Sequence, residues 1–368
     1  MTNIKISDLN FIIFLIAYPN LLNAEIFSPM ADDFLGPEEE LNDTIENSPI
    51  SSNYNNIDKI LNVINLDVLR RKTYNQIDQH ARKTPESAEK TLKNLAVYLT
   101  QPATNEFEKA RAIYVWITHN ITYNTADLHS GYFTNLSAEK VLQNQQTICE
   151  GYANLFQMLG NYAGLETRKI TGYSKGYSDL LKVISSSDSN HAWNAIKIQG
   201  NWYLIDSTWG AGYVDGKNTF VRKFNEHYFL ASPKEFIYTH FPENSHWQLL
   251  EKKLTFEEYT NLVYLRPAFF DNNLLLNSHY KYLIKTNDEL TIILSAPDDV
   301  SLLAELEQYG KKLNKSFITI KKHGEKRYIQ ARLPYFGDYI LRLFAKRYQD
   351  TENYKWVLDY KIETGLEQ

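Results

Sequence analysis

The chain has 368 residues, which favours two domains with extensions over one ordinary domain of about 100–200 residues. Its 43% hydrophobic and 14% aromatic content is enough to fill buried cores and excludes a globally disordered chain. There are 39 basic and 44 acidic side chains, a net charge of -5, and no long basic run. This balance argues against nucleic-acid binding, which needs clustered Lys and Arg side chains.

Residues 1–24 have the pattern of a secretory signal peptide. Lys5 lies near the amino terminus, an apolar run extends from Phe11 to Ala17, and Leu22-Asn23-Ala24 has the character of a cleavage site. The apolar run is shorter than the ~20 residues that a membrane-spanning helix needs, and no later segment qualifies. We therefore predict secretion or export to the cell envelope or periplasm, without a membrane span. Residues 25–56 are acidic and polar, which predicts a linker.

Helical periodicity follows the linker. It predicts one helix from Val68 to about Ala81, a second that begins after Thr84-Pro85 and continues to Leu99, and a third from about Glu106 to Asn120. The apolar stripes of these helices predict a single packing layer.

The sequence changes character after Leu250. From about Leu254 onward, short segments rich in Ile, Leu, Tyr and Phe alternate with turn residues such as Lys322-His323-Gly324 and Gly337-Asp338. This spacing predicts an antiparallel β-sandwich over residues 254–368.

Cys149 is the only cysteine, so the chain forms no internal disulfide and no cysteine-based zinc cluster. A single cysteine is usually an inert core residue, but the surrounding sequence argues against that interpretation here. Thr147, with Glu150 three residues later, has the pattern of a capping box and predicts a helix that ends at Gly164. Cys149 would then lie in the first helical turn, where the positive end of the helix favours a thiolate.

His191 and Asp206 bracket a predicted β-hairpin. Gly200-Asn201 suits a tight turn, and a turn centred between these residues pairs positions whose numbers add up to 401, such as Ile196 with Ile205. Side chains alternate along a strand, so Asp206 and His191 are expected on the same face. A carboxylate that orients an imidazole beside a thiol is the arrangement that activates a cysteine nucleophile.

These residues predict a catalytic triad with Cys149 as nucleophile, His191 as general base and Asp206 as orienting carboxylate. Their surroundings resemble the transglutaminase-like superfamily, and within it the kyphoscoliosis peptidase branch. The resemblance covers residues 92–250 well and the β-rich tail more loosely. Its main stretches are Arg111-Ala112-Ile113-Tyr114-Val115-Trp116-Ile117, Cys149-Glu150-Gly151-Tyr152-Ala153, His191-Ala192-Trp193-Asn194-Ala195 and Trp202-Tyr203-Leu204-Ile205-Asp206-Ser207-Thr208-Trp209-Gly210.

The resemblance implies an α+β fold, with a papain-like, transglutaminase-like catalytic core over residues 57–250 and an immunoglobulin-like β-sandwich after it. It also implies acyl transfer through a thioester, to water in peptidases and to an amine in transglutaminases, without a cofactor or a catalytic metal. Gln143, six positions before Cys149, is a candidate oxyanion donor beside the backbone N–H of Cys149. Trp193 and Tyr152 are candidates for the substrate groove, with core packing an equal alternative for Trp193.

His240 and His246 are interpreted as structural or surface residues and not as metal ligands. The leading functional hypothesis is a thiol hydrolase that acts on protein or peptide amides, with the β-sandwich available for protein docking. Two alternatives stay open: a transglutaminase or deamidase that acts on Gln side chains, and a weakly active or inactive binding protein.

Overall fold

The computed structural model describes residues 74–130, 133, 136–176 and 189–365. The predicted signal peptide (1–24), the predicted linker (25–56) and the first part of the helix predicted from Val68 lie outside these ranges. Within them, no helix combines the length and the apolar character that crossing a membrane requires.

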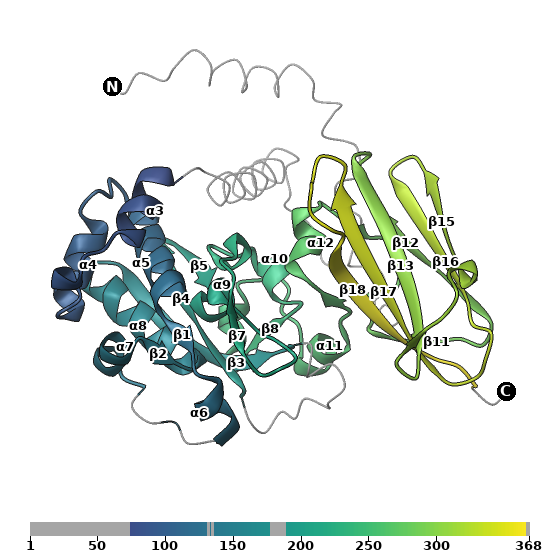
Figure 1. The fold of residues 1–368 in the computed structure, drawn as a ribbon, viewed down its shortest axis with the longest axis horizontal. Helices are drawn as coiled ribbons and strands as arrows, with labels where there is room; N and C mark the ends of the chain where they lie inside the picture. Colours follow the sequence, from purple (N-terminus) through teal and green to yellow (C-terminus); the bar gives the residue numbers. More distant parts are fainter. Residues whose placement is uncertain (1–73, 131–132, 134–135, 177–188, 366–368) are drawn as a thin grey trace, which may run out of the picture. The chain divides into compact units, whose positions relative to one another are not determined.

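A layer of helices forms the amino-terminal part of the described chain (Figure 1). It contains α3 (Asn75–Arg82), α4 (Leu92–Thr100), α5 (Glu106–Asn120), α6 (Thr125–Ser130), α7 (Ala138–Asn144) and α8 (Cys149–Tyr162). The helix predicted over Glu106–Asn120 is confirmed at both ends. The helix predicted after Thr84-Pro85 is wrong as a single element, because it divides into the 3-10 turn η3 (Glu86–Ala88) and α4. The division occurs where the Thr91 side chain caps α4 by accepting a hydrogen bond from the N–H of Asn94.

The end of α8 is confirmed at Gly164. This glycine has a φ of 76°, the left-handed conformation expected just beyond a helix. The N–H of Leu165 donates to the carbonyl of Gly160 at 2.9 Å, and the N–H of Gly164 donates to that of Asn161 at 3.1 Å. This pair of bonds satisfies carbonyls that would otherwise lack partners at the end of the helix.

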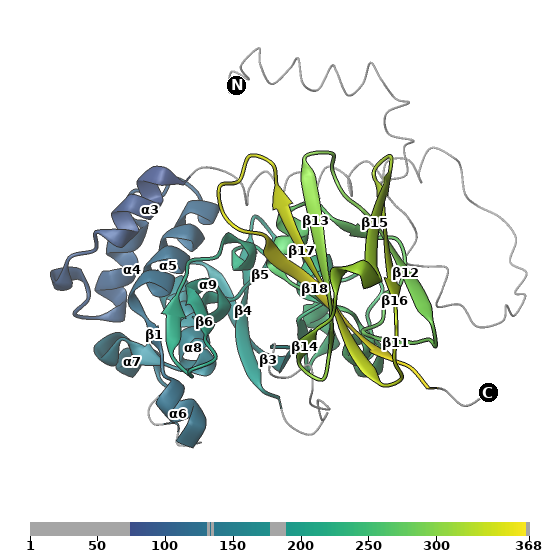
Figure 2. The same cartoon turned by 45° about the vertical axis from the view of Figure 1, so that its right-hand side comes forward.

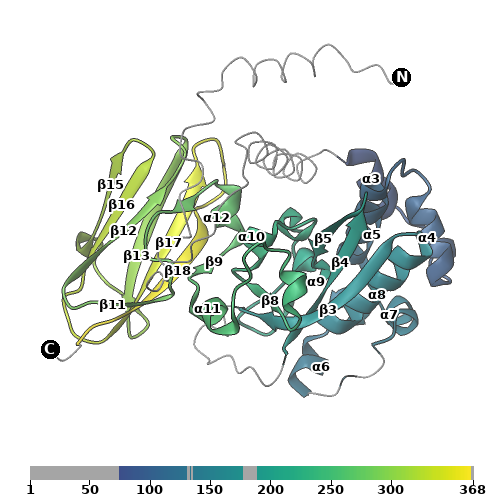
Figure 3. The ribbon, with the colours of Figure 1, turned by 180° about the vertical axis from the view of Figure 1, so that it is seen from behind.

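A four-stranded antiparallel sheet packs against α8, as Figure 3 shows from behind. Its strands lie in the order β5 (Asn201–Ile205), β4 (His191–Ile198), β3 (Glu166–Ser174) and β8 (His240–Pro242). On the face toward α8, the Asn194 amide donates to the carbonyl of Ala153 at 3.0 Å. Trp193 and Ala195 belong to the other face and pack in a separate cluster with Phe236.

The predicted β4–β5 hairpin forms, but its predicted register is wrong. Paired residues have numbers that add up to 399, so that Ile196 faces Tyr203 instead of Ile205. The turn residues are Gln199 and Gly200, with φ values of 50° and 84°, as a two-residue hairpin turn with positive φ at both positions requires. The error is two residues, and an even shift keeps every side chain on its predicted face.

The carboxy-terminal part is a β-sandwich, as predicted (Figures 1 and 2). One sheet has the order β10 (Leu275–Leu276), β12 (Glu289–Ser295), β16 (Lys326–Arg332) and β15 (Ile318–His323). The other has the order β11 (Leu283–Lys285), β18 (Lys355–Glu363), β17 (Asp338–Arg347), β13 (Val300–Gln308) and β14 (Lys311–Lys312), and β9 (Tyr264–Leu265) also pairs with β18. All of these pairs are antiparallel except β11 with β18.

Two details of this region differ from the predictions. The turn between β15 and β16 lies at Gly324-Glu325, so only Gly324 of the predicted turn Lys322-His323-Gly324 belongs to it, because Lys322 and His323 still pair with β16. In addition, two short helices, α11 (Phe256–Asn261) and α12 (Pro267–Asp271), precede most of the strands. The described chain is therefore an α+β core followed by an immunoglobulin-like sandwich.

Candidate active site

Cys149 is the first residue of α8, and its side chain is half-buried. The prediction that Thr147 caps this helix is wrong, because the N-cap is Ile148 and makes no side-chain capping bond. Thr147 instead belongs to β2 (Gln146–Thr147), which pairs in parallel with β1 (Thr122–Tyr123). The strand pairing therefore sets the position of the cysteine at the helix start, without a capping box.

Glu150 carries a negative charge next to Cys149, where it opposes thiolate formation. Its carboxylate accepts a hydrogen bond from the Nζ atom of Lys169 at 2.7 Å. The ion pair partly neutralises this charge, and both side chains are partly exposed, so solvent screens what remains.

His191 and Asp206 form a buried hydrogen-bonded pair. His191 is the first residue of β4, and Asp206 follows β5 as the N-cap of α9 (Ser207–Ala211). The distance from Nε2 of His191 to Oδ2 of Asp206 is 2.8 Å. Oδ1 of Asp206 accepts the N–H groups of Thr208 at 2.8 Å and Trp209 at 3.0 Å. The capping bonds hold one carboxylate oxygen on the helix and direct the other at the imidazole.

The charges of this pair stabilise each other. Burial by itself lowers the pKa of His191, but the charge and hydrogen bond of Asp206, with a smaller contribution from a hydrogen bond to Cys149, raise it to about 10. Burial by itself raises the pKa of Asp206, but His191 and His240 hold it well below its usual range. At neutral pH the pair is an imidazolium and a carboxylate. Because Nε2 of His191 binds Asp206, Nδ1 is the ring nitrogen left for the thiol.

A buried arginine connects α5 to the backbone of Asp206. The Arg111 guanidinium donates to both oxygens of Asp78, at 2.8 and 2.7 Å, and to both oxygens of Glu226, one of them at 2.6 Å. Glu226 begins the 3-10 turn η5 (Glu226–Tyr228), and the carbonyl of Tyr228 accepts the N–H of Asp206 at 3.0 Å. The helical layer thus fixes the turn on which the backbone of Asp206 is held.

The other three predicted site residues lie elsewhere or in the core. Gln143 is on the exposed side of α7, where its side-chain oxygen accepts a hydrogen bond from Lys140 at 3.1 Å. Tyr152 is buried and donates its hydroxyl to the carbonyl of Ile121 at 2.7 Å. Trp193 is buried as well, with its ring centre 6.0 Å from that of His191, so it shields the imidazole instead of lining an open groove.

Sequence reasoning missed Tyr123. This half-buried residue lies on β1 and pairs with Thr147, two residues before the cysteine. Burial, followed by the charges of Cys149 and Asp206, raises the pKa of Tyr123, so its hydroxyl stays protonated. Because the charge of Cys149 contributes to this shift, the phenol lies near the nucleophile. Among the described residues its hydroxyl has no hydrogen-bond partner, so this donor is available to a ligand. The parallel pairing of β1 with β2 brings it there, and that pairing leaves no short sequence pattern.

Of the two roles expected for His240, structural or surface, the structure supports the structural one. His240 is buried, and its Nε2 atom lies 3.0 Å from Oδ2 of Asp206, the oxygen that also binds His191. By contrast, His246 is exposed, as expected.

His191, Asp206 and His240 offer three ligand atoms within 4.8 Å of one another, and zinc accepts such a donor set. Their separations of 2.8 and 3.0 Å are hydrogen-bond distances, and each imidazole uses its Nε2 atom to bind the carboxylate. The three groups therefore satisfy one another without a metal ion.

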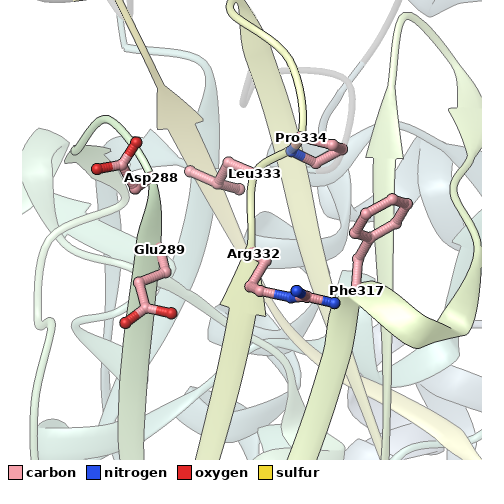
Figure 4. Close-up of a pocket in the computed structure, with 6 residues that line it drawn as sticks. All are labelled: Asp288, Glu289, Phe317, Arg332, Leu333 and Pro334. Atoms are coloured by element: carbon pink, nitrogen blue, oxygen red, sulfur yellow. The ribbon is translucent and has the colours of Figure 1, made fainter.

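A cavity of about 340 Å³ lies in the carboxy-terminal part and is lined by Asp288, Glu289, Phe317, Arg332, Leu333 and Pro334. In Figure 4 the Arg332 side chain lies between Glu289 and Phe317. No cysteine or histidine lines this cavity, so it offers none of the chemistry found around Cys149.

Two family models match the chain: the transglutaminase-like superfamily over residues 93–207, and a KY-like, immunoglobulin-like domain over residues 256–365. The first match includes Cys149, His191 and Asp206. Residues 93–207 therefore form a transglutaminase-like domain.

Among curated proteins, the chain is 32% identical over 294 residues to the kyphoscoliosis peptidase of Homo sapiens, covering 79% of this chain and 43% of that protein. It is 32% identical over 246 residues to hillarin of Drosophila melanogaster, covering 62% of this chain and 29% of hillarin. The chain thus spans less than half the length of these relatives. Among solved structures, a TGase is 16% identical, covers 46% of this chain and 40% of that chain, and has a TM-score of 0.25.

Proposed function

We propose that this protein cleaves protein or peptide amides through a thioester on Cys149, with His191 as proton carrier and Asp206 as the orienting carboxylate. The observation that carries the proposal is the buried His191–Asp206 hydrogen bond of 2.8 Å, on an imidazole that also interacts with a cysteine at a helix start. A histidine with a purely structural role would not require a cysteine thiol beside it, nor that this cysteine lie at the start of a helix.

In the first half-reaction the Cys149 thiolate attacks the amide carbonyl carbon. A C–S bond forms, the C–N bond breaks, and the amine leaves with a proton from the His191 imidazolium. In the second half-reaction His191 accepts a proton from water, whose oxygen attacks the thioester. The C–S bond then breaks, which releases the carboxylic acid and restores the Cys149 thiolate and the His191 imidazolium. Throughout, Asp206 holds the ring in place and stabilises its charged form.

The developing oxyanion needs hydrogen-bond donors directed at it. The N–H of Cys149 at the first position of α8 is one candidate. The Tyr123 hydroxyl is a second candidate, because it carries a proton, lies near the thiol and has no partner among the described residues. It takes the role that the sequence suggested for Gln143, whose amide is bound to Lys140.

The deciding experiment measures the alkylation rate of Cys149 by iodoacetamide from pH 4 to 11, in wild type and in His191→Ala. An ion pair predicts reactivity that persists well below the ordinary thiol pKa of about 8.5 and is lost in the variant. An ordinary thiol titration in the wild type would overturn the proposal.

Incubation of the wild type with casein and a fluorescent primary amine then identifies the acyl acceptor. New peptide termini indicate hydrolysis. Incorporated amine indicates the transglutaminase alternative, which the transglutaminase-like domain keeps open. If the thiol proves activated but neither product forms, the inactive binding protein is favoured.

In every case the immunoglobulin-like part is proposed to dock protein substrates or partners. Export by residues 1–24 stays a prediction from the sequence.

A further inference from the structure

We propose that His240 is a positioning residue of the active site, where its neutral imidazole donates a second hydrogen bond to Asp206 and fixes the carboxylate that orients His191. This inference rests on the proposed function and deepens it by adding a fourth residue to the catalytic group. The contact that motivates it is the 3.0 Å distance from Nε2 of His240 to Oδ2 of Asp206.

Strand pairing brings the two histidines to the same face of the sheet. His191 on β4 pairs with Gly172 on β3, and His240 on β8 pairs with Ser174 on the other side of β3. Residues paired across strands point to the same face, and so do residues two apart on one strand. Both imidazoles therefore reach the face on which Asp206 lies, from opposite sides of β3.

Gly172 makes this close approach possible. A Cβ atom added there would lie 2.3 Å from the carbonyl oxygen of Phe241, 2.9 Å from Cα of Pro242 and 2.6 Å from the Trp193 ring. Two of these three contacts involve backbone of β8, the strand that carries His240. A side chain at position 172 would push this strand away from β3.

The hydrogen bonds of His240 determine its tautomer. An ionised carboxylate only accepts hydrogen bonds, so the proton is on Nε2, which faces Asp206. Nδ1 is then an acceptor and receives the hydroxyl of Thr239 at 2.9 Å. With both nitrogens satisfied, this neutral ring is a fixed donor. Burial, the largest influence, lowers the pKa of His240 to about 4 in spite of the nearby carboxylate, so the ring is neutral at physiological pH.

Aromatic side chains hold the His240 ring in place. Phe236 stacks on it with ring centres 3.8 Å apart and planes 13° from parallel. Trp209 and Trp193 lie at 4.6 and 5.3 Å on further sides. Such an enclosure leaves the imidazole no alternative orientation and admits no solvent, since the His240 side chain is 0% exposed.

This arrangement gives Asp206 four hydrogen bonds: two from backbone N–H groups on Oδ1, and two from imidazoles on Oδ2. If the His240 donor is removed, the carboxylate keeps its capping bonds but loses one of the two bonds that fix Oδ2. We expect the Asp206 carboxylate then to orient His191 less well, so that the pairing of the His191 imidazolium with the Cys149 thiolate weakens.

The test compares the pH profile of Cys149 alkylation by iodoacetamide in full-length variants. His240→Met removes the donor and keeps bulk, whereas His240→Gln keeps an amide donor at similar reach. His279→Met is the control, because His279 is a half-buried histidine of the carboxy-terminal part whose Nδ1 atom lies 2.9 Å from the Ser278 hydroxyl, and it has no contact with Asp206 among the described residues. Melting temperature and near-ultraviolet circular dichroism are recorded for each variant. Thr239→Val, which removes the partner of Nδ1 only, is a milder change in case His240→Met does not fold.

In His240→Met we expect the rate at pH 7 to fall about tenfold or more, and the lower limb of the profile to rise by about one pH unit toward an ordinary thiol titration. His240→Gln should recover the rate to within about threefold, and Thr239→Val should lie between the two. His279→Met should keep the wild-type profile even if its melting temperature falls.

A wild-type profile in His240→Met, or the same loss in His279→Met, would overturn the inference. The outcomes also separate it from the proposed function. If wild-type Cys149 titrates as an ordinary thiol, the proposed function fails. If the wild type shows an activated thiol and His240→Met is unchanged, only the positioning role fails.

Discussion

Nε2 of His191 lies 2.8 Å from Oδ2 of Asp206, and the two side chains are 4% and 0% exposed. A buried imidazole would ordinarily be neutral, but this carboxylate raises the pKa of His191 to about 10. The cost of burying either charge alone is offset by the other charge and by the hydrogen bonds around Asp206.

Asp206→Asn removes the negative charge and nearly preserves the shape. Without it, burial should return the pKa of His191 to below 6.5, so the thiol loses its cationic partner at neutral pH. We expect the alkylation rate of Cys149 at pH 7 to fall about 100-fold or more. Asp298→Asn, at a side chain that is 79% exposed, is the control and should leave the rate unchanged. Equal rates in the wild type and Asp206→Asn would contradict this role.

Tyr123→Phe tests the proposed oxyanion donor. Removal of one such donor should slow acylation by p-nitrophenyl acetate about 10²- to 10³-fold. Alkylation by iodoacetamide forms no oxyanion, so its rate should stay within about twofold. Tyr152→Phe removes a buried hydroxyl bound to the carbonyl of Ile121 and controls for loss of stability. A parallel decline of acylation and alkylation in Tyr123→Phe would count against the donor role.

Gly172→Ala should destabilise the fold because its Cβ meets backbone atoms of β8. Overpacking of this kind costs about 1–3 kcal/mol, and the upper end is expected because backbone yields less than a side chain. Gly216→Ala is the control, since nothing lies within 4 Å of its Cβ position, and its effect should be within about 0.5 kcal/mol. Urea unfolding measures both. A neutral effect at position 172 would show that β8 can shift.

Arg111→Met breaks the buried network that supports η5, the turn whose Tyr228 carbonyl holds the backbone N–H of Asp206. The change leaves Asp78, 14% exposed, with only the more distant Arg82 at 3.9 Å, while Glu226 is 54% exposed and regains water. We expect a loss of about 3 kcal/mol, the low end for a broken buried pair. Arg168→Met, at an exposed pair with Glu166, should cost under about 1 kcal/mol. Similar urea midpoints for the two variants would be inconsistent with this network.

The contribution of His240 should make the protein less stable as the pH drops from about 6.5 to 4. The folded-state pKa of His240, about 4, is below its unfolded value of 6.5, so the unfolded chain binds more protons in this window. His119 and His279, whose pKa values are also lowered by burial, act in the same direction. To isolate the contribution of His240, the urea midpoint of unfolding is measured from pH 6.5 to 4 in the wild type and in His240→Met. The change in the difference between the two midpoints over this range gives the contribution of His240. Parallel pH curves would contradict it.

The opposite sign applies to His191. Its folded-state pKa is raised to about 10, so its contribution to stability is complete below pH 6.5 and is lost as the pH rises through about 10. The same deprotonation removes the proton donor for the leaving amine. Turnover is therefore expected to decline along with stability at the alkaline end.

Local patterns in the sequence determined the elements and the candidate residues. Glu106–Asn120 is a helix with the predicted ends, Gly164 terminates α8, and His191 and Asp206 lie at the two ends of one hairpin, because capping, turn chemistry and periodicity act within a few residues. The hairpin register was wrong because a neighbouring pair, Gln199-Gly200, also forms a tight turn, and a local pattern does not choose between them.

The surroundings of Asp206 depend on contacts between distant parts of the chain. His240 reaches the carboxylate through the pairing of β8 with β3, whose paired residues Ser174 and His240 lie far apart in the chain. Tyr123 reaches the cysteine through the pairing of β1 with β2. Such contacts depend on which strands become neighbours once the whole core is packed, so no sequence window contains them. Local sequence patterns thus indicate the residues that could form the site, whereas packing of the whole core brings the partners that hold them there.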